Sequence, residues 1–400
     1  MSDAPLTKKT NRPADSDFKQ QRLKAWQPIL TPAWVIGTFV VIGIAFVPIG
    51  AVLLAASDSV VEEKIQYGGA KVDGIKDDII TIGANKILTL TPKADMKGPV
   101  YVYYELENFY QNHRRYVKSR TDGQLRAQLG ADFDTEKAAE KTFGEPSWAE
   151  KVQSSLSTCE PMVLPSDEKF PKPDCTYGEG NCKVLWPCGL IASSFFNDVF
   201  IPEGDLVKSV VTSGKCEQRT GKAWCEKGIA WKSDVDTKFK NPAGWGDPKM
   251  WKMDNTSIYK WLHQRYPVFN NLTNNSLFTE GVENEHFIVW MRTAGLPTFR
   301  KLYAIIGADN GPDKVTLEKG KDVKIQVHSQ FDVDSFSGKK RLVMSTVSWL
   351  GGKNNFLGIA YIVVGSISLL LAAMFGAKHI ISPRKLGDTT YLVWQDKNKN

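Results

Sequence analysis

The chain has 400 residues, a mass of 44.6 kDa and a formal net charge of +7, and 42% of its residues are hydrophobic. A charge this small, spread along so long a chain, argues against a nucleic-acid-binding protein. Two stretches, residues 34–56 and 356–377, contain no charged side chain. Each could form a helix of about 33–35 Å, long enough to cross a hydrocarbon core of about 30 Å. These features exclude an ordinary cytosolic globule, and two spans are too few for a polytopic pump.

Basic residues around the first apolar stretch predict its orientation. Six Lys or Arg lie in residues 1–33 and three in the twenty residues after the stretch, which predicts a cytosolic N-terminus. The stretch begins too late and is too long for a cleaved signal peptide, so we interpret it as an uncleaved anchor. The expected organisation is a cytosolic tail (1–33), transmembrane helix 1 (34–56), an exoplasmic domain (57–355), transmembrane helix 2 (356–377) and a second cytosolic tail (378–400).

All six cysteines lie between the two spans, as disulfides in an oxidising compartment would. Six cysteines allow fifteen pairings. Short-loop closure favours Cys175–Cys182 and Cys216–Cys225, which leaves Cys159–Cys188. Zinc is the alternative, but the spacings contain no CxxC pair. Three N-x-S/T acceptors, at Asn255, Asn271 and Asn274, fall in the same region and predict N-linked glycans.

Strand patterns recur in the predicted exoplasmic domain. They cover residues 78–82, 86–90, 100–106, 323–327 and 342–349, and Val323, Ile325 and Val327 would share one face. Helices are expected near residues 123–129 and 257–265. Strands near both ends of the domain predict an antiparallel β-sandwich with inserted helices and disulfide-held loops, whose first and last strands lie near the membrane.

Motifs of catalysis and cofactor binding are missing from the sequence. It contains no GxxxxGK[ST] phosphate loop, no HExxH, no GxSxG and no P-type phosphorylation site. Carboxylate pairs such as Glu105/Glu107 are explained by strand alternation. The expectation is therefore a protein that is not an enzyme and carries no cofactor apart from glycans.

Small residues recur at helical spacing in both apolar stretches. Gly358, Gly365 and Ala372 repeat every seven residues in the second, and Gly43 and Gly50 have the same interval in the first. Such stripes allow close approach of another helix, either the chain's own or a partner's. Pro48 is expected to kink the first helix. Neither stretch has an ionisable residue, which argues against an ion pathway.

Several long strings resemble the Cdc-fifty/Lem family, the accessory β-subunits of type-IV P-type ATPase lipid flippases. They are residues 18–30 (FKQQRLKAWQPIL), 47–50 (VPIG), 108–120 (NFYQNHRRYVKSR), 188–198 (CGLIASSFFND), 287–303 (FIVWMRTAGLPTFRKLY) and 349–361 (WLGGKNNFLGIAY). The resemblance covers nearly the whole chain. It includes the most basic local run, residues 108–120. Taken alone, this run favours a solvated strand-to-helix connection over a cationic-aromatic patch that meets a partner or the headgroup surface.

The resemblance implies a non-catalytic subunit that forms a heterodimer with the ATPase, contacts membrane lipids and binds no nucleic acid. The subunit would support exit of the ATPase from the endoplasmic reticulum and the transport cycle of the ATPase. It would reside in the endoplasmic reticulum, in Golgi or endosomes, or at the plasma membrane. The resemblance also implies the Cys159–Cys188 pair. The chain has no cysteine cluster early in the predicted exoplasmic domain, and in this it resembles fungal members of the family more than animal ones. The expected partner-binding residues are Phe18, Gln20, Gln21, Arg22, Trp26, Pro28, Pro48, Gly50, Tyr110, Arg114, Arg115, Gly358 and Gly365.

Two other functions fit the same topology. A two-span ligand-gated channel would need a polar or charged pore lining, which the apolar stretches do not provide. An adhesion or receptor ectodomain would be delivered to the cell surface without any partner pump.

Overall fold

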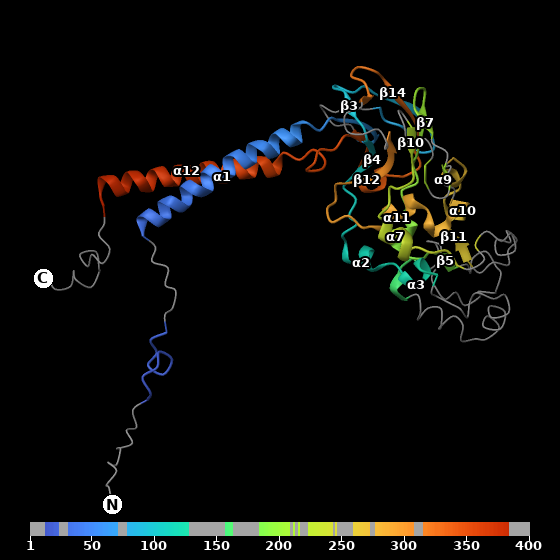
Figure 1. Cartoon of the computed structure of the whole chain (residues 1–400). Coiled ribbons are helices and arrows are strands. Elements are labelled where there is room, and N and C mark those ends of the chain that lie inside the picture. The colour runs from blue at the N-terminus through green and yellow to red at the C-terminus, as the bar shows by residue number, and fades with distance from the viewer. Residues whose placement is uncertain are drawn as a thin grey trace, which may run out of the picture. The chain divides into compact units, whose positions relative to one another are not determined.

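The structure is a computed structural model. It describes residues 13–23, 31–70, 78–127, 157–162, 184–208, 211–212, 215–216, 223–242, 245, 259–272, 277–307 and 315–383. The chain divides into two compact units (Figure 1). The helical unit comprises Met1–Ala55 and Asn355–Asn400, and the β-rich unit comprises Ala56–Asn354.

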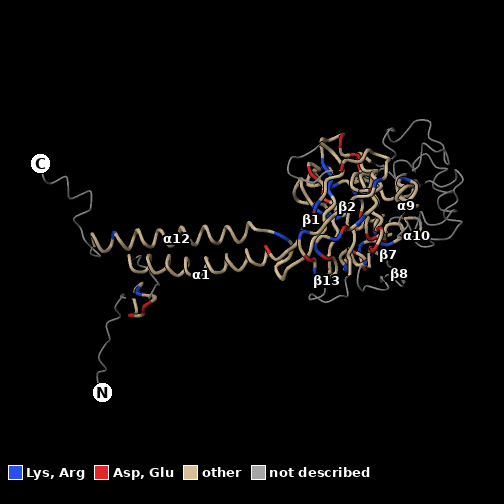
Figure 2. Tube along the Cα trace, turned by 90° about the horizontal axis from the view of Figure 1, so that it is seen from above, with Lys and Arg blue, Asp and Glu red and all other residues tan. Residues whose placement is uncertain are grey.

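The helical unit is built on α1 (Pro32–Asp58) and α12 (Phe356–Ile381), which lie side by side in both views (Figures 1 and 2). Both begin within two residues of the predicted spans, and α12 continues four residues beyond its predicted end. Among the described residues, these two helices are long and apolar enough to cross a membrane.

The glycine stripes of α1 and α12 face each other. A Cβ atom added at Gly50 would lie 2.8 Å from the carbonyl oxygen of Gly358, and one added at Gly43 would lie 3.0 Å from that of Gly365. A Cβ at Gly365 would lie 2.9 Å from Cγ2 of Val47. Glycine is therefore what allows the two backbones to approach so closely. Of the two partners that the stripes allow, the structure places the chain's own helix against these glycines.

The β-rich unit contains a six-stranded sheet with the order β1-β15-β4-β12-β10-β7. All neighbours are antiparallel except β10 and β7. The first and last strands of this sheet along the chain, β1 and β15, are neighbours. The strands are β1 (Glu62–Gly69), β4 (Val100–Glu107), β7 (Val207–Lys208), β10 (Ala223–Cys225), β12 (Phe299–Ile306) and β15 (Lys339–Ser345).

A three-stranded antiparallel sheet has the order β2-β14-β6, and three two-stranded sheets accompany it. The three strands are β2 (Asn85–Leu90), β6 (Val199–Glu203) and β14 (Val323–His328). The two-stranded sheets pair β3 (Met96–Lys97) with β13 (Val315–Leu317), β5 (Val184–Trp186) with β11 (Tyr259–Trp261), and β8 (Val211–Thr212) with β9 (Lys215–Cys216).

Short helices complete the described part of this unit. They are α2 (Arg114–Lys118), α3 (Asp122–Leu125), α6 (Leu190–Ser193), α7 (Lys232–Thr237), α8 (Leu262–Arg265), α9 (Pro267–Leu272), α10 (Leu277–Glu280) and α11 (Glu285–Met291). Single 3-10 turns are η1 (Ser157–Cys159), η3 (Gly281–Glu283) and η4 (Asp334–Phe336).

Alternation along the strands gives the sheets one apolar face. Val323, Ile325 and Val327 of β14 are buried together, as predicted. Phe200 of β6 contacts the rings of Tyr67 in β1 and Tyr303 in β12, at centroid distances of 5.8 and 4.6 Å. The two larger sheets therefore contribute to one aromatic core.

On the opposite face of β4, the alternation places a charged side chain. Glu105 lies there, and its cross-strand neighbours in register are Arg300 on β12 and Arg341 on β15. Oε2 of Glu105 accepts a hydrogen bond from Nε of Arg300 at 2.6 Å, and Oε1 accepts one from Arg341 at 2.6 Å. Opposite charges in register favour this strand pairing. Although burial raises it, these hydrogen bonds hold the pKa of Glu105 below its ordinary value.

Four expectations about the elements were wrong. The strand expected at residues 342–349 is β15, which begins at Lys339 and ends at Ser345. Residues 78–82 form no strand, although the backbone N–H groups of Asp78 and Ile80 donate to carbonyls of β1. Within residues 257–265 the helix is confined to α8, because β11 pairs with β5. The sheets are also not wholly antiparallel, since β10–β7 and β11–β5 are parallel.

Candidate functional site

The string of residues 108–120 runs from the end of β4 through α2. Its first residue, Asn108, adopts φ of 67°, and its side-chain amide donates to the carbonyl oxygen of Phe336 at 2.7 Å. The next residue, Phe109, is the centre of an aromatic cluster. Its ring contacts those of Tyr116, Trp290, Phe299, Phe331 and Phe336, at centroid distances of 5.3–6.3 Å.

The same string presents polar groups to solvent. Tyr110 is 56% exposed, and Arg114 and Arg115 on α2 are exposed as well. Gln111, by contrast, is fully buried and accepts a hydrogen bond from the backbone N–H of Ala294 at 2.9 Å. The string is therefore anchored in the core and carries its predicted partner-binding residues on the surface.

A disulfide bond joins Cys159 to Cys188, with their Cα atoms 5.6 Å apart. This pairing confirms the one that the sequence left after short-loop closure. Ser119, at the end of the string, donates its hydroxyl to the carbonyl oxygen of Cys159 at 2.8 Å. Gln124 of α3 accepts a hydrogen bond from the backbone N–H of Cys188 at 2.7 Å. Both hydrogen bonds tie the chain around α2 and α3 to the disulfide.

The other cysteines and the sequons are only partly placed. Cys225 is disulfide-bonded. Cys175, Cys182 and the side chain of Cys216 lie outside the described residues, as do Asn255 and Asn274. Asn271 lies on α9 and is exposed.

Residues of the predicted N-terminal contact segment lie partly in the described range. Phe18 is 77% exposed, Gln21 and Arg22 are exposed, and Gln20 is half-buried. Arg22 forms an ion pair with Asp15. Trp26 and Pro28 lie outside the described residues, and Pro48 lies inside α1.

Two buried lysines were missed by the sequence reasoning. Nζ of Lys340 on β15 lies 2.8 Å from Oδ2 of Asp198, and both side chains are at most 1% exposed. Nζ of Lys301 on β12 donates to the carbonyl oxygens of Val289, Trp290 and Arg292 at 2.5–2.9 Å. These carbonyls belong to the C-terminal end of α11, where a cation is favourable. Burial lowers the pKa of Lys301.

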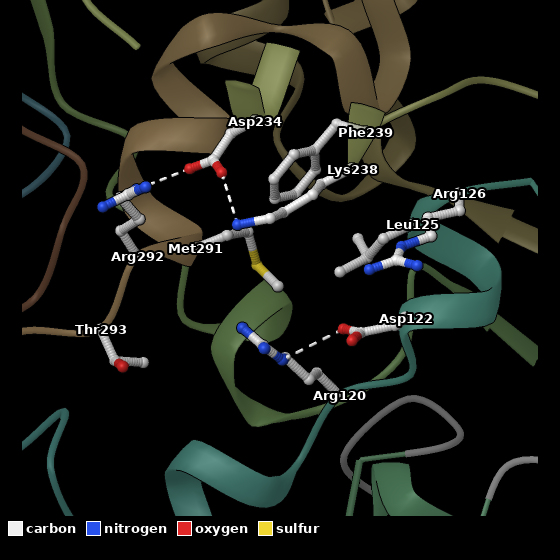
Figure 3. Close-up of a pocket in the computed structure, with 10 residues that line it drawn as sticks. All are labelled: Arg120, Asp122, Leu125, Arg126, Asp234, Lys238, Phe239, Met291, Arg292 and Thr293. Carbon is white, nitrogen blue, oxygen red and sulfur yellow. Dashed lines mark hydrogen bonds and ion pairs between the residues drawn. The ribbon is translucent and has the colours of Figure 1, made fainter. Parts of the chain in front are cut away.

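A cavity of about 480 Å³ lies beside α3 and α7 (Figure 3). Its lining comes from segments far apart in the chain. It combines buried apolar side chains with four basic and two acidic ones, and no sequence motif indicated it. The lining residues are Arg120, Asp122, Leu125, Arg126, Asp234, Lys238, Phe239, Met291, Arg292 and Thr293.

The charged residues of the cavity form two ion-pair groups. Asp234, whose side chain is 2% exposed, holds Lys238 at 2.7 Å and Arg292 at 2.5 Å. Burial raises the pKa of Asp234, but the hydrogen bonds from Arg292 and Lys238 outweigh that effect and lower it. Nε of Arg120 lies 3.3 Å from Asp122. Among the described residues, no group of three or more His, Cys, Asp or Glu side chains is arranged to hold a metal ion.

Comparisons with known proteins cover almost the whole chain. ALA-interacting subunit 3 of Arabidopsis thaliana is 39% identical over 97% of this chain and 92% of its own length. Cell cycle control protein 50A of Bos taurus is 38% identical over 92% of this chain and 89% of its own. The phospholipid-transporting ATPase accessory subunit CDC50 of Chaetomium thermophilum is 31% identical over 98% and 92%. The model of the LEM3 (ligand-effect modulator 3)/CDC50 family matches residues 53–385. The chain therefore belongs to the LEM3/CDC50 family, as its motifs predicted.

Proposed function

We propose that this protein is a non-catalytic accessory subunit of a type-IV P-type ATPase that moves phospholipids from the exoplasmic to the cytosolic leaflet. The observation that carries this proposal is the family match over residues 53–385, together with a relative, similar along nearly its whole length, that is named as an accessory subunit of a phospholipid-transporting ATPase. The residues of the chain bind and position the partner rather than perform the chemistry of ATP hydrolysis.

The architecture supports a two-span membrane subunit. α1 and α12 are apolar, have the length of a span and precede and follow the β-rich unit. In our proposal both helices cross the membrane and the two tails are cytosolic. The β-rich unit is then exoplasmic, with its two larger sheets forming a sandwich. The disulfide Cys159–Cys188 supports an oxidising location for that unit.

Contacts with the ATPase would come from both sides of the membrane. The N-terminal segment 18–30 would contact the cytosolic side. Tyr110, Arg114 and Arg115 are exposed on a rigidly anchored string and would contact the exoplasmic loops. Such a subunit biases the transport cycle only through contacts that differ between the conformations of the pump.

Affinity purification of the tagged full chain in mild detergent, followed by mass spectrometry, tests this function. We expect a P-type ATPase to co-purify, and Gln21→Ala, Trp26→Ala and the pair R114E/R115E to reduce its yield. Asp17→Ala and Lys319→Glu are matched controls, because both residues are exposed but lie outside the proposed contacts. Stable expression and delivery of the chain in cells without any such ATPase would contradict the proposal.

We also propose N-linked glycosylation of the β-rich unit. Asn271 is exposed near the end of α9, where an oligosaccharide could be attached. A glycosidase-sensitive gel shift that is reduced in Asn271→Gln would support this site. The same assay on Asn255→Gln and Asn274→Gln separates the three acceptors.

A further inference from the structure

We propose that the cavity beside α3 and α7 binds the phosphate group of a small ligand, a phosphate monoester or inorganic phosphate. The proposal does not depend on the accessory-subunit function, because it rests on the shape and charge of this cavity alone. Its volume of about 480 Å³ falls in the range of small-molecule sites, roughly 300–1,000 Å³.

The lining of the cavity combines apolar and charged side chains. Leu125, Phe239 and Met291 are at most 5% exposed and form apolar lining. The charged side chains come from α3 and its flanks, from α7 and the residue after it, and from the residue after α11. A few convergent polar groups beside apolar side chains are typical of ligand sites.

Cations outnumber carboxylates in the lining. Four basic side chains face two acidic ones, so the cavity has a formal charge of +2. Asp234 alone neutralises part of the charge of both Lys238 and Arg292. A phosphate monoester carries about −1.5 to −2 near neutral pH, which matches this excess better than the single charge of a carboxylate.

Two arginines supply donors that no residue in the described part of the chain uses. The ion pair of Arg120 with Asp122 runs through Nε, and no described residue accepts a hydrogen bond from the two terminal nitrogens of Arg120. The guanidinium group of Arg126 has no hydrogen-bonding or ion-pair partner among the described residues. Figure 3 shows the nitrogens of Arg120, Arg126 and Lys238 around one space, with Arg292 on the other side of Asp234. Paired N–H donors of guanidinium match phosphate oxygens in geometry.

The walls that carry these groups are held in place before any ligand arrives. Ser119 and Gln124 connect the segment around Arg120 and Arg126 to the disulfide-bonded cysteines. The backbone N–H of Lys240 donates to the carbonyl oxygen of Leu125 at 2.8 Å, which joins α3 to the chain that follows α7. On the opposite wall, the guanidinium of Arg292 lies 4.0 Å from the ring centroid of Trp231. A preorganised site loses little entropy on binding.

Isothermal titration calorimetry on the purified full chain tests the proposal with three probes: inorganic phosphate, O-phosphoserine, and short-chain phosphatidic acid in detergent micelles. We expect binding of at least one probe. R120Q/R126Q should weaken it by about tenfold or more, since two charge-assisted donors are lost. Lys319→Gln, which removes an exposed charge outside the cavity, should leave the affinity unchanged. Arg126→Lys keeps the charge but removes the paired N–H donors of the guanidinium group, so it should give an intermediate loss of affinity.

The probes also separate the sources of the ligand. Equal affinity for inorganic phosphate and O-phosphoserine would indicate a free phosphate group, and tighter binding of phosphatidic acid would indicate a lipid headgroup. Thermal unfolding of each variant checks its fold. If R120Q/R126Q unfolds early, the single variant Arg126→Gln at an exposed position replaces it. The proposal is overturned if the parent protein binds none of the probes, or if the arginine variants bind as tightly as the parent. It is also overturned if the variants lose only a co-purifying protein, because the cavity would then be a protein contact.

Discussion

Replacing Lys340 by Met tests the buried ion pair at the centre of the β-rich unit. Lys340 shares the core face of β15 with Leu342 and Met344, and its ammonium group donates to Asp198, to Ser329 and to the carbonyl oxygen of Phe331. Met preserves most of the side-chain volume. The substitution therefore leaves Asp198 as a buried carboxylate without its cation.

The structure sets the expected magnitude. Both partners are at most 1% exposed, so solvent cannot replace the lost charge. Breaking one partner of such a buried pair costs about 3–5 kcal/mol. Asp198 keeps hydrogen bonds from Tyr67 and from the backbone N–H groups of Gln330 and Phe331, which favours the lower part of this range. With an unfolding entropy of about 0.6 kcal/mol/K for a unit of this size, the melting temperature should fall by about 5–8 °C.

Intrinsic tryptophan fluorescence during thermal unfolding of the full chain in detergent measures this change. Lys321→Met is the matched control, because Lys321 pairs with Glu318 on the surface and the two side chains are 61% and 54% exposed. Solvent screens an exposed pair, so its loss should hardly change the melting temperature. K340M/D198N should recover part of the loss, since no uncompensated charge remains. If Lys340→Met shifted the melting temperature no more than Lys321→Met, the buried pair would not stabilise the fold as argued.

Three further perturbations test other parts of the structure. Cys159→Ser removes a disulfide between residues 29 apart in sequence and should destabilise the protein by about 3–4 kcal/mol. A lower melting temperature and altered mobility on a non-reducing gel would show this. Ser157→Ala is the control for a substitution in the same turn. Gly365→Leu should separate α1 from α12 and so reduce cross-linking between cysteines introduced at Phe46 and Tyr361, whose rings are 4.9 Å apart. Gly37→Leu is the control, because a Cβ atom at Gly37 would have open space around it. Equal cross-linking yields in the two variants would exclude close glycine packing. Glu105→Gln should lower the melting temperature at neutral pH, with the difference from the parent disappearing in acid. Its lowered pKa means that this carboxylate stabilises the fold above its ordinary value of 4.5 and loses that effect as pH falls through the lower folded value, so a difference that grows in acid would contradict the assignment.

Periodicity was sufficient for the regular strands. Residues 86–90, 100–106 and 323–327 were predicted as strands, and β2, β4 and β14 confirm them within one residue at each end. Alternating apolar side chains in these segments match the pleat of a sheet with one buried face. Residues 78–82 have similar composition. They are not a strand because only isolated backbone groups of that segment bond to β1.

The buried lysines could not be predicted in the same way. Lys301 occupies a core-facing position of β12 between Phe299 and Tyr303, but a charged residue in an alternating segment is normally assigned to solvent. The groups that make its burial favourable are carbonyl oxygens at the end of α11. Nothing in a sequence pattern indicates that this helix ends against β12, because that depends on tertiary packing.

Residues of the candidate site could be predicted only where they lie in one short segment of the sequence. Tyr110, Arg114 and Arg115 follow one another closely in the sequence, and the structure exposes them on one segment. The cavity residues Arg120, Asp234 and Arg292 are separated by more than a hundred and by about sixty positions. Only the folded arrangement of α3, α7 and α11 brings them together.

The pairing of β1 with β15 has a consequence for biosynthesis. β15 is the sheet partner of β1, and it is translated after every other strand that the structure describes. The groups of β1 that pair with β15 therefore stay unpaired until nearly the whole β-rich unit has been synthesised. During the interval between synthesis of β1 and synthesis of β15, the nascent chain exposes an unpaired strand edge. Such edges aggregate or are bound by chaperones.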